Sequence, residues 1–152
     1  MRARVEALVA EGKLDEAQAA LRAELELHAE RAELHMELAD VHYHRYWRND
    51  TITEWDRALT LDPALANDPR ITTRLCAILG ARWKGAGAQL IERRLGRAAV
   101  PAIVACAEKA TDLARLQAAA ELAERLGGKD AIDAQLVARR TLELSAKGAP
   151  RE

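Results

Sequence analysis

Hydrophobic residues in the first half of the chain recur at helical spacing, in two stretches separated by a short polar break. Apolar side chains at positions i, i+4 and i+7 share one face of a helix, so each stretch predicts an amphipathic α-helix. The segment 32–65 contains both stripes and is bounded by turn-forming residues. The stripes are Leu34, Leu38 and Val41 in the first helix and Trp55, Leu59 and Leu61 in the second.

The ends of the second helix are also marked in the sequence. Asp50 or Thr51 is the predicted N-cap, and Glu54 stands where a capping box places its acidic partner. At the other end Asp62 precedes Pro63, and a residue before proline is disfavoured in the α conformation. The segment therefore predicts a helix, a turn, a second helix and an abrupt end.

The preceding residues repeat this unit with a period of 34 residues. Gly12 lies in the turn between the two helices of the earlier unit. A period of this length with two helices in each unit is typical of stacked helical hairpins, each of which buries its apolar face against a neighbour. The matching pairs are Ala17 with Thr51, Leu21 with Trp55, Leu25 with Leu59, and Leu27 with Leu61.

Several of these positions carry a family resemblance. In the first unit they are Gly12, Leu14, Ala17 and Leu21; in the second they are Leu38, Ala39, Ala58, Leu59, Asp62 and Pro63. At these positions residues 1–65 resemble the tetratricopeptide repeat family. The sequence departs from the family pattern at Glu24, at Thr51 and at Tyr46, which replaces the turn glycine.

The second half of the chain predicts further helices without the 34-residue register. Pro101 lies near a first turn, Asp112 and Asp130 are expected caps, and Gly127 is an expected helix end. Residues 96–128 resemble a HEAT repeat, and the order of elements resembles tail segments of certain bacterial serine/threonine protein kinases. The expected helices cover residues 71–81, 87–96, 98–110, 112–128 and 130–146.

Together these patterns and resemblances predict an all-α fold. The expected architecture is a right-handed α-solenoid of stacked antiparallel helical hairpins, with about eight or nine helices. We expect a single helical-repeat domain over residues 1–152, resembling tetratricopeptide repeats in 1–65 and HEAT hairpins in 66–152. The 33 alanines and 21 leucines, with no phenylalanine, agree with this prediction because both residues are strong helix formers.

The remaining composition bears on location. Cys76 and Cys106 are 30 residues apart, which matches no metal or redox spacing, so we expect two buried free thiols in a reducing compartment. The N-terminal residues are acidic where a signal peptide would be apolar, and no apolar run approaches the roughly 18 residues that span a membrane. These features predict a cytoplasmic protein that does not enter the membrane.

The sequence shows no catalytic or cofactor motif. The glycines in 84–90 and 127–130 lack the spacing of nucleotide-binding loops, and kinase signatures are absent. Asp40 and His44 are one helical turn apart, a spacing that two metal ligands can have, but we interpret them as a hydrogen-bonded pair. We therefore expect no enzyme activity, no cofactor and no metal.

Candidate binding residues come from two arguments. The segment 42–55 holds four of the five aromatic residues, beside Arg45 and Arg48. Trp47 and Trp55 either fill the corner between helices, or Tyr43, Tyr46, Trp47 and Arg48 line a recognition surface, where Tyr, Trp and Arg are enriched. The family resemblance implies a concave groove. Its positions fall on Glu33, Met36, Asp40, Tyr43 and His44, with Arg2, Glu6 and Val9 from the preceding unit.

These observations predict a scaffold that binds a protein or peptide segment, as a docking part of a bacterial signalling protein. Met36 and Asp40 stand where chaperone-binding relatives carry Lys and Asn, so the resemblance implies a basic or mixed apolar ligand. Two alternatives stay open. The chain has a net charge of −6 over residues 1–63 and +5 over 64–152, so the basic half could bind nucleic acid. An exposed end of the solenoid could instead form a homo-oligomer.

Overall fold

The computed structural model describes residues 1–79, 85–109, 113–127 and 140–146 of the chain. These residues form helices and turns, and no strand occurs among them, so the all-α prediction is confirmed. The chain divides into two compact units, Met1–Arg70 and Ile71–Glu152, which are described separately. The boundary expected after residue 65 falls inside a short helix just before this division.

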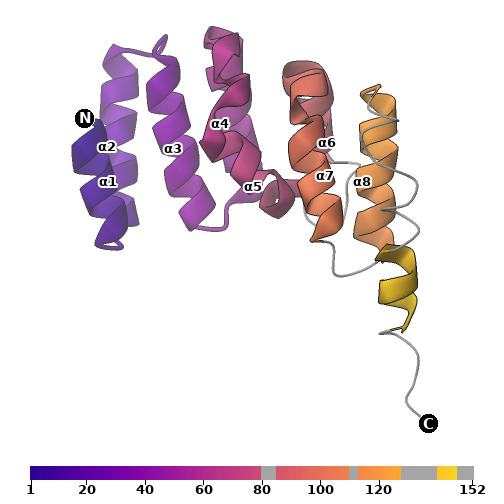
Figure 1. Cartoon of the computed structure of the whole chain (residues 1–152). Coiled ribbons are helices and arrows are strands. Elements are labelled where there is room, and N and C mark those ends of the chain that lie inside the picture. Colours follow the sequence, from indigo (N-terminus) through magenta and orange to yellow (C-terminus); the bar gives the residue numbers. More distant parts are fainter. Residues whose placement is uncertain (80–84, 110–112, 128–139, 147–152) are drawn as a thin grey trace. The chain divides into compact units, whose positions relative to one another are not determined.

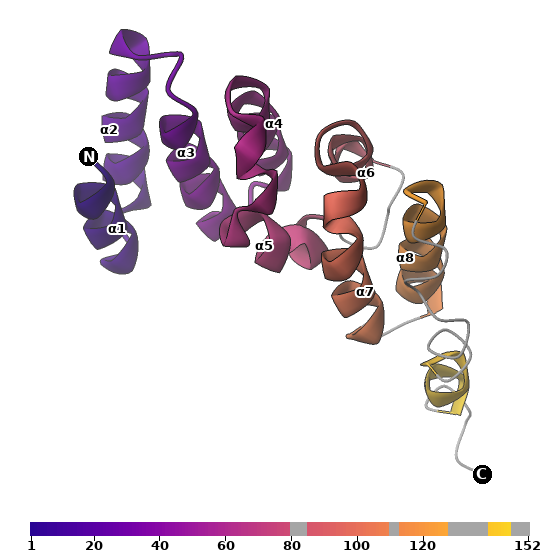
Figure 2. The ribbon, with the colours of Figure 1, turned by 45° about the horizontal axis from the view of Figure 1, so that its top comes forward.

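The first unit consists of four α-helices followed by a short 3-10 helix (Figure 1). Helix α3 packs against α1, α2 and α4, and these helices lie side by side in both views of the ribbon (Figures 1 and 2). The bounds are α1 Arg2–Ala10, α2 Leu14–Leu27, α3 Ala32–His44, α4 Arg48–Leu61 and η1 Pro63–Asn67.

The backbone repeats with the period of 34 residues that the sequence predicts. Helices α2 and α4 each have 14 residues, and α4 begins and ends 34 positions after α2. The turns before them match as well: Gly12 has φ 74° and Tyr46 has φ 60°. In each turn the N–H of the left-handed residue, Gly12 or Tyr46, donates to the carbonyl of the residue three positions earlier, at 3.0 Å. These bonds are those of a Schellman helix end.

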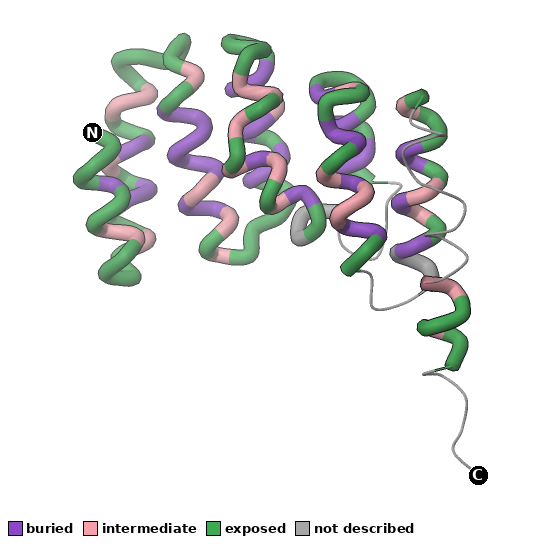
Figure 3. The backbone as a smooth tube through the Cα atoms, viewed as in Figure 1, coloured by how far each residue is buried: buried purple, intermediate pink, exposed green. Residues whose placement is uncertain are grey.

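The core of the first unit follows the same register. Leu21 of α2 and Trp55 of α4 are repeat equivalents, and both are completely buried. The last pair of equivalents, Leu27 and Leu61, is exposed, so the buried stripe of α4 ends at Leu59 rather than at Leu61. Helix α3 carries eight buried residues whereas α1 carries only Val5, because α3 has neighbours on both sides (Figure 3).

The predicted end of α4 is confirmed, but its predicted start is wrong. Asp62 leaves the helix with φ −138° and ψ 96°, and its carboxylate accepts a 3.0 Å hydrogen bond from the N–H of Ala64. Helix α4 starts at Arg48, before the expected caps Asp50 and Thr51. Thr51 instead lies inside the helix, and its hydroxyl donates to the Trp47 carbonyl at 2.9 Å.

The second unit is also helical. Helices α7 and α8 pack against each other, and Pro101 stands in the first turn of α7 as predicted. The predicted helix 87–96 is a short helix, a π-helical turn and a 3-10 turn, with Gly96 at φ 52°. The bounds are α5 Pro69–Leu79, α6 Ala86–Leu90, η2 Ile91–Leu95, η3 Gly96–Ala99, α7 Val100–Glu108 and α8 Leu113–Arg125.

Gly127 ends α8 with φ 73°, and its N–H bonds to the Glu124 carbonyl at 2.9 Å, in agreement with the predicted helix end. Residues 140–146 form a further helical segment within the predicted helix 130–146. The predicted caps Asp112 and Asp130 lie outside the described residues.

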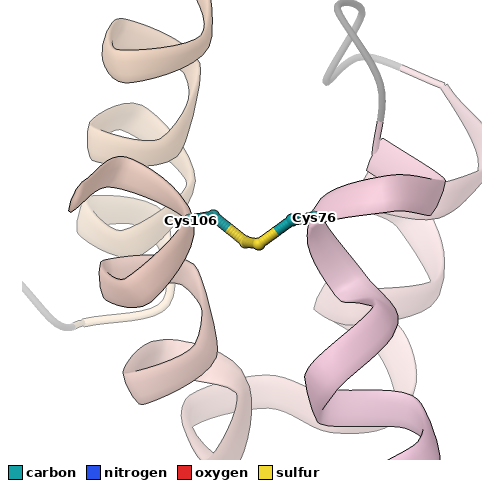
Figure 4. The surroundings of a disulfide bond; sticks show 2 residues. All are labelled: Cys76 and Cys106. Carbon is teal, nitrogen blue, oxygen red and sulfur yellow. A yellow bond between two sulfur atoms is a disulfide. The ribbon is translucent and has the colours of Figure 1, made fainter. Parts of the chain in front are cut away.

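Cys76 of α5 and Cys106 of α7 form a disulfide bond, with their Cα atoms 5.4 Å apart (Figure 4). The expectation of two buried free thiols is therefore wrong. Only Cys106 is buried, while Cys76 is exposed. Disulfides persist mainly in oxidising compartments, so this bond weighs against the cytoplasmic location, which stays a prediction. Among the described residues, no helix combines the length and apolar character that crossing a membrane requires.

Candidate functional site

A cavity of about 230 Å³ lies between α1 and α3 of the first unit. Helix α3 contributes Glu37, Asp40 and His44, which follow one another at intervals of three and four residues and so share one helix face. Arg70, at the end of the unit, also lines the cavity. Helix α1 contributes Arg2, Val5, Glu6, Val9 and Ala10.

The cavity brings together residues that the sequence analysis placed in the concave groove. Asp40 and His44 face the same space as Arg2, Glu6 and Val9. These three residues of α1 stand 34 positions before Met36, Asp40 and Tyr43, so they occupy the same repeat positions in the preceding unit. Of these equivalent positions in α3, only Asp40 also lines the cavity.

The other predicted groove residues lie elsewhere. Met36 is completely buried, which is a correction, because a residue without exposed surface cannot contact a partner. The central position of α3 explains this burial. Glu33 is exposed but does not line the cavity, and Tyr43 is half-buried with its ring edge-on to that of His44, 5.9 Å away.

The two guanidinium groups at the cavity are held by carboxylates. Arg2 donates to Glu6 at 2.8 Å, and this bond raises the pKa of Arg2. Arg70 donates through Nε and through its terminal nitrogen to both oxygens of Asp68, at 2.7–3.2 Å. This bidentate pair lowers the pKa of Asp68 and raises the pKa of Arg70. Both cations are thus fixed at the rim.

Glu37 was missed by the sequence analysis and is the most unusual group in the cavity. The residue is only 7% exposed, and its Oε2 atom has no hydrogen-bond partner among the described residues. Burial raises the pKa of its carboxyl group above the ordinary value, although the charges of Arg2 and Arg70 act in the opposite direction. A buried acceptor without a donor is costly, by roughly 1–3 kcal/mol.

The aromatic candidates form a separate surface at the turn between α3 and α4. Tyr46, Trp47 and Arg48 line an open depression of about 690 Å³ together with Asn49 and Asp50. Tyr46 is 88% exposed and Trp47 is 43% exposed. Of the predicted binding residues, Asp40 and His44 thus line the cavity, and Tyr46, Trp47 and Arg48 line this depression. The others, Glu33, Met36 and Tyr43, line neither.

Trp47 also has a packing role within the corner. The Arg45 guanidinium lies 4.7 Å from the centroid of its ring, and the His42 ring lies 5.7 Å away. Arg45 in turn pairs with Asp15 of α2. Trp55 is completely buried. Trp47 thus packs in the corner and keeps exposed surface, and its role in a recognition surface stays a prediction.

A third hollow, of about 470 Å³, lies between the C-terminal ends of α2 and α4 and is mostly apolar. His35 at its edge lies 2.6 Å from Glu54, measured from Nδ1 to the carboxylate, and Glu54 also accepts a 3.0 Å bond from Arg57. His35 and Glu54 are therefore engaged in the structure of the helix pair. No group of three or more potential metal ligands occurs among the described residues.

The basic half of the chain, to which nucleic-acid binding is attributed, has seven Lys and Arg residues between positions 70 and 97. Some of them are bonded within the protein. Arg70 is paired with Asp68, and Arg97 donates to the carbonyl of Gly127 at 3.3 Å. Arg82 and Lys84 lie outside the described residues. Binding of nucleic acid and self-association both stay predictions, as does the absence of enzyme activity.

The cavity between α1 and α3 thus combines a repeat-defined position, an apolar wall and an unpartnered buried carboxylate, which makes it the candidate binding site. Comparison of the chain with protein-family models, with curated proteins and with solved structures finds no match in any of the three.

Proposed function

We propose that the first unit is a protein-binding module that holds a segment of a partner protein on the face formed by α1 and α3. The observation that carries this proposal is the shared cavity. Arg2, Glu6 and Val9 face Asp40 and His44, the positions that the repeat register assigns to one groove. Helical hairpins of this length resemble tetratricopeptide repeats, whose groove binds protein segments.

The dimensions of the cavity also favour a segment over a small molecule. Small-molecule sites are usually about 300–1,000 Å³ and are lined mainly by apolar groups. This cavity has only about 230 Å³, which is below that range. It is therefore suited to one side chain of a longer ligand, whose remaining contacts fall on the exposed face around it. We propose no catalytic role for these residues.

Selection from a random linear-peptide library on the immobilised full chain tests this function. We expect peptides that bind the wild-type chain and lose most of their affinity for His44→Ala, because His44 is an exposed residue of the cavity. Glu26→Ala is the matched control, since Glu26 is exposed on α2 and does not line the cavity.

Two results would count against the function. One is a selection that yields no peptide binding the folded chain above background. The other is a set of peptides whose affinity falls equally in the His44→Ala and Glu26→Ala chains, because this would place binding away from the cavity. A role as the docking part of a bacterial signalling protein is the finer form of the proposal, and it rests on the kinase-tail resemblance alone.

A further inference from the structure

The carboxylate of Glu37 has an unmet requirement for a hydrogen-bond donor. Glu37 lines the cavity, is 7% exposed, and has an Oε2 atom without a partner among the described residues. A carboxylate has two oxygens and about four acceptor positions, so a single missing donor at a buried oxygen is significant. The residue that carries this acceptor is one of those that line the cavity.

The two cations beside the cavity are already bonded to other carboxylates. The Arg2 guanidinium is held by Glu6 at 2.8 Å, and Arg70 is held by both oxygens of Asp68. The wall itself carries three carboxylates, those of Glu6, Glu37 and Asp40, against these two guanidinium groups. With Asp68, four carboxylates stand against Arg2, Arg70 and the N-terminal ammonium that also acts on Glu37. The cavity therefore has an excess of negative charge, and its ligand is expected to be a cation.

The walls of the cavity also favour a cation with an apolar stem. Helix α1 contributes the apolar residues Val5, Val9 and Ala10 beside the charged Arg2 and Glu6. Lysine and arginine side chains place their methylene groups along apolar surface and their charged heads on polar groups. The volume of about 230 Å³ limits the occupant to one such side chain.

We propose that the cavity between α1 and α3 binds one lysine or arginine side chain of a partner segment, whose cationic head donates hydrogen bonds to Glu37. This inference rests on the proposed protein-binding function and specifies the residue that the segment must carry. The methylene groups of the bound side chain contact Val5 and Val9. Charge-assisted hydrogen bonds of this kind are roughly twice as strong as neutral ones.

A titration of the full chain followed by backbone amide NMR shifts tests the proposal. The probes are acetylated and amidated Gly-Lys-Gly, Gly-Arg-Gly and Gly-Gln-Gly peptides. We expect saturable shifts at Val5, Val9 and Asp40 with the two basic peptides and no saturable shift with the glutamine peptide. Because one subsite is occupied, the dissociation constants are expected to be on the order of millimolar.

Two variants connect the binding to the cavity. Glu37→Gln keeps the shape of the side chain and removes its charge, so we expect about a tenfold loss of affinity for the basic peptides. Ala10→Leu narrows the cavity at an exposed helix position without altering its charge and is expected to weaken the same peptides. Glu33→Gln is the control, because Glu33 is an exposed carboxylate on the same helix outside the cavity lining.

Four outcomes would overturn the proposal. The first is unchanged affinity in Glu37→Gln, and the second is equal binding of the glutamine peptide. The third is binding of butylammonium as tight as that of the lysine peptide, because this would assign the cavity to free amines. Shifts confined to the Tyr46–Asp50 depression would also overturn it, while the broader protein-binding function, tested by library selection, would stand.

Discussion

Gly12 and Tyr46, which are 34 residues apart, adopt the same left-handed backbone conformation at the same place in successive helical hairpins. The residues after them also match: the N–H of Lys13 bonds to the Leu8 carbonyl at 2.8 Å, and that of Trp47 to the His42 carbonyl at 2.9 Å. The same turn conformation therefore recurs in both repeat units, with glycine in one and tyrosine in the other. Tyrosine adopts it at a cost, since a left-handed non-glycine residue is destabilised by about 1–2 kcal/mol.

Replacing Tyr46 by glycine is expected to stabilise the first unit. Tyr46 is 88% exposed, so its removal sacrifices little packing. We expect the free energy of unfolding to rise by about 0.5–1 kcal/mol in urea denaturation, after the greater flexibility of glycine in the unfolded chain is subtracted. Tyr46→Ala is the control, because alanine keeps the strained conformation. A gain in alanine equal to that in glycine would contradict the explanation.

Leu21→Ala and Leu27→Ala are expected to differ greatly although both residues lie on the same helix. Leu21 is completely buried in the core cluster with Val5, Leu34 and Leu38, whereas Leu27 is 75% exposed. The first substitution should lower the free energy of unfolding by about 2–5 kcal/mol. The second should change it by less than about 0.5 kcal/mol. Similar losses in the two variants, measured by urea denaturation, would disprove the register of the repeat.

Glu37→Gln is expected to stabilise the free protein at neutral pH. The pKa of Glu37 in the folded protein is raised above 4.5 by burial, although Arg2, the N-terminal ammonium and Arg70 oppose this and Glu33 adds to it. Glu37 therefore makes its full contribution to the free energy of unfolding below pH 4.5, and this contribution is lost as pH rises through the pKa of the folded protein. The variant should gain about 1 kcal/mol at neutral pH and nothing at acidic pH. If Glu37→Gln is no more stable than wild type at neutral pH, the raised pKa of Glu37 is contradicted.

The contribution of His42 to stability is expected to depend on pH in the opposite direction to that of Glu37. The residue is 3% exposed, and neither ring nitrogen has a hydrogen-bond partner among the described residues. Burial lowers the pKa of His42 below 6.5, although the charges of Asp50 and Glu54 raise it. The unfolded chain therefore takes up a proton first, and stability falls as pH drops below 6.5.

The contribution of His42 is measured as the difference between wild type and His42→Leu, since Glu37 titrates in the same chain. We expect wild type to lose stability relative to this variant when urea denaturation is repeated at successively lower pH from about 7.5. If the difference in the free energy of unfolding between wild type and His42→Leu does not change with pH, the pKa of His42 is not lowered in the folded protein.

Reducing the disulfide between Cys76 and Cys106 is expected to destabilise the second unit selectively. The bond closes a loop across a sequence separation of 30 residues, and such cross-links stabilise folded chains by about 2–4 kcal/mol. Amide hydrogen exchange should therefore speed up in α7 after reduction, and it should not change in α2. If hydrogen exchange speeds up equally in α7 and α2, the disulfide does not stabilise the second unit selectively, and the prediction is contradicted.

Much of the first unit could be predicted because the repeat appears in both sequence and backbone. Leu21 and Trp55 were matched by a shift of 34 and are both buried, and Pro63 fixes the helix end before it. The same shift applied to Leu14 gives Arg48, the observed start of α4. The capping pattern at Thr51 predicts a later start for α4 and is wrong, whereas the repeat predicts the observed start.

The family resemblance implies groove positions, of which Asp40 and His44 line the cavity in α3, but it does not indicate how far each residue is buried. Leu34, Glu37, Leu38 and Val41 follow one helical stripe, so the spacing could have placed Glu37 on the buried side of α3. Met36 was assigned to the groove by analogy, although the helices on both sides of α3 cover it. The disulfide could not be predicted, because the spacing of Cys76 and Cys106 in the sequence does not show that the fold brings their Cα atoms within 5.4 Å.

The most direct test of the binding account is a measurement of intermolecular nuclear Overhauser effects between the Gly-Lys-Gly peptide and the full chain. The account predicts contacts between the side-chain methylene protons of the lysine and the methyl groups of Val5 and Val9. Contacts with the ring of Trp47 instead, and none with the two valines, would contradict it.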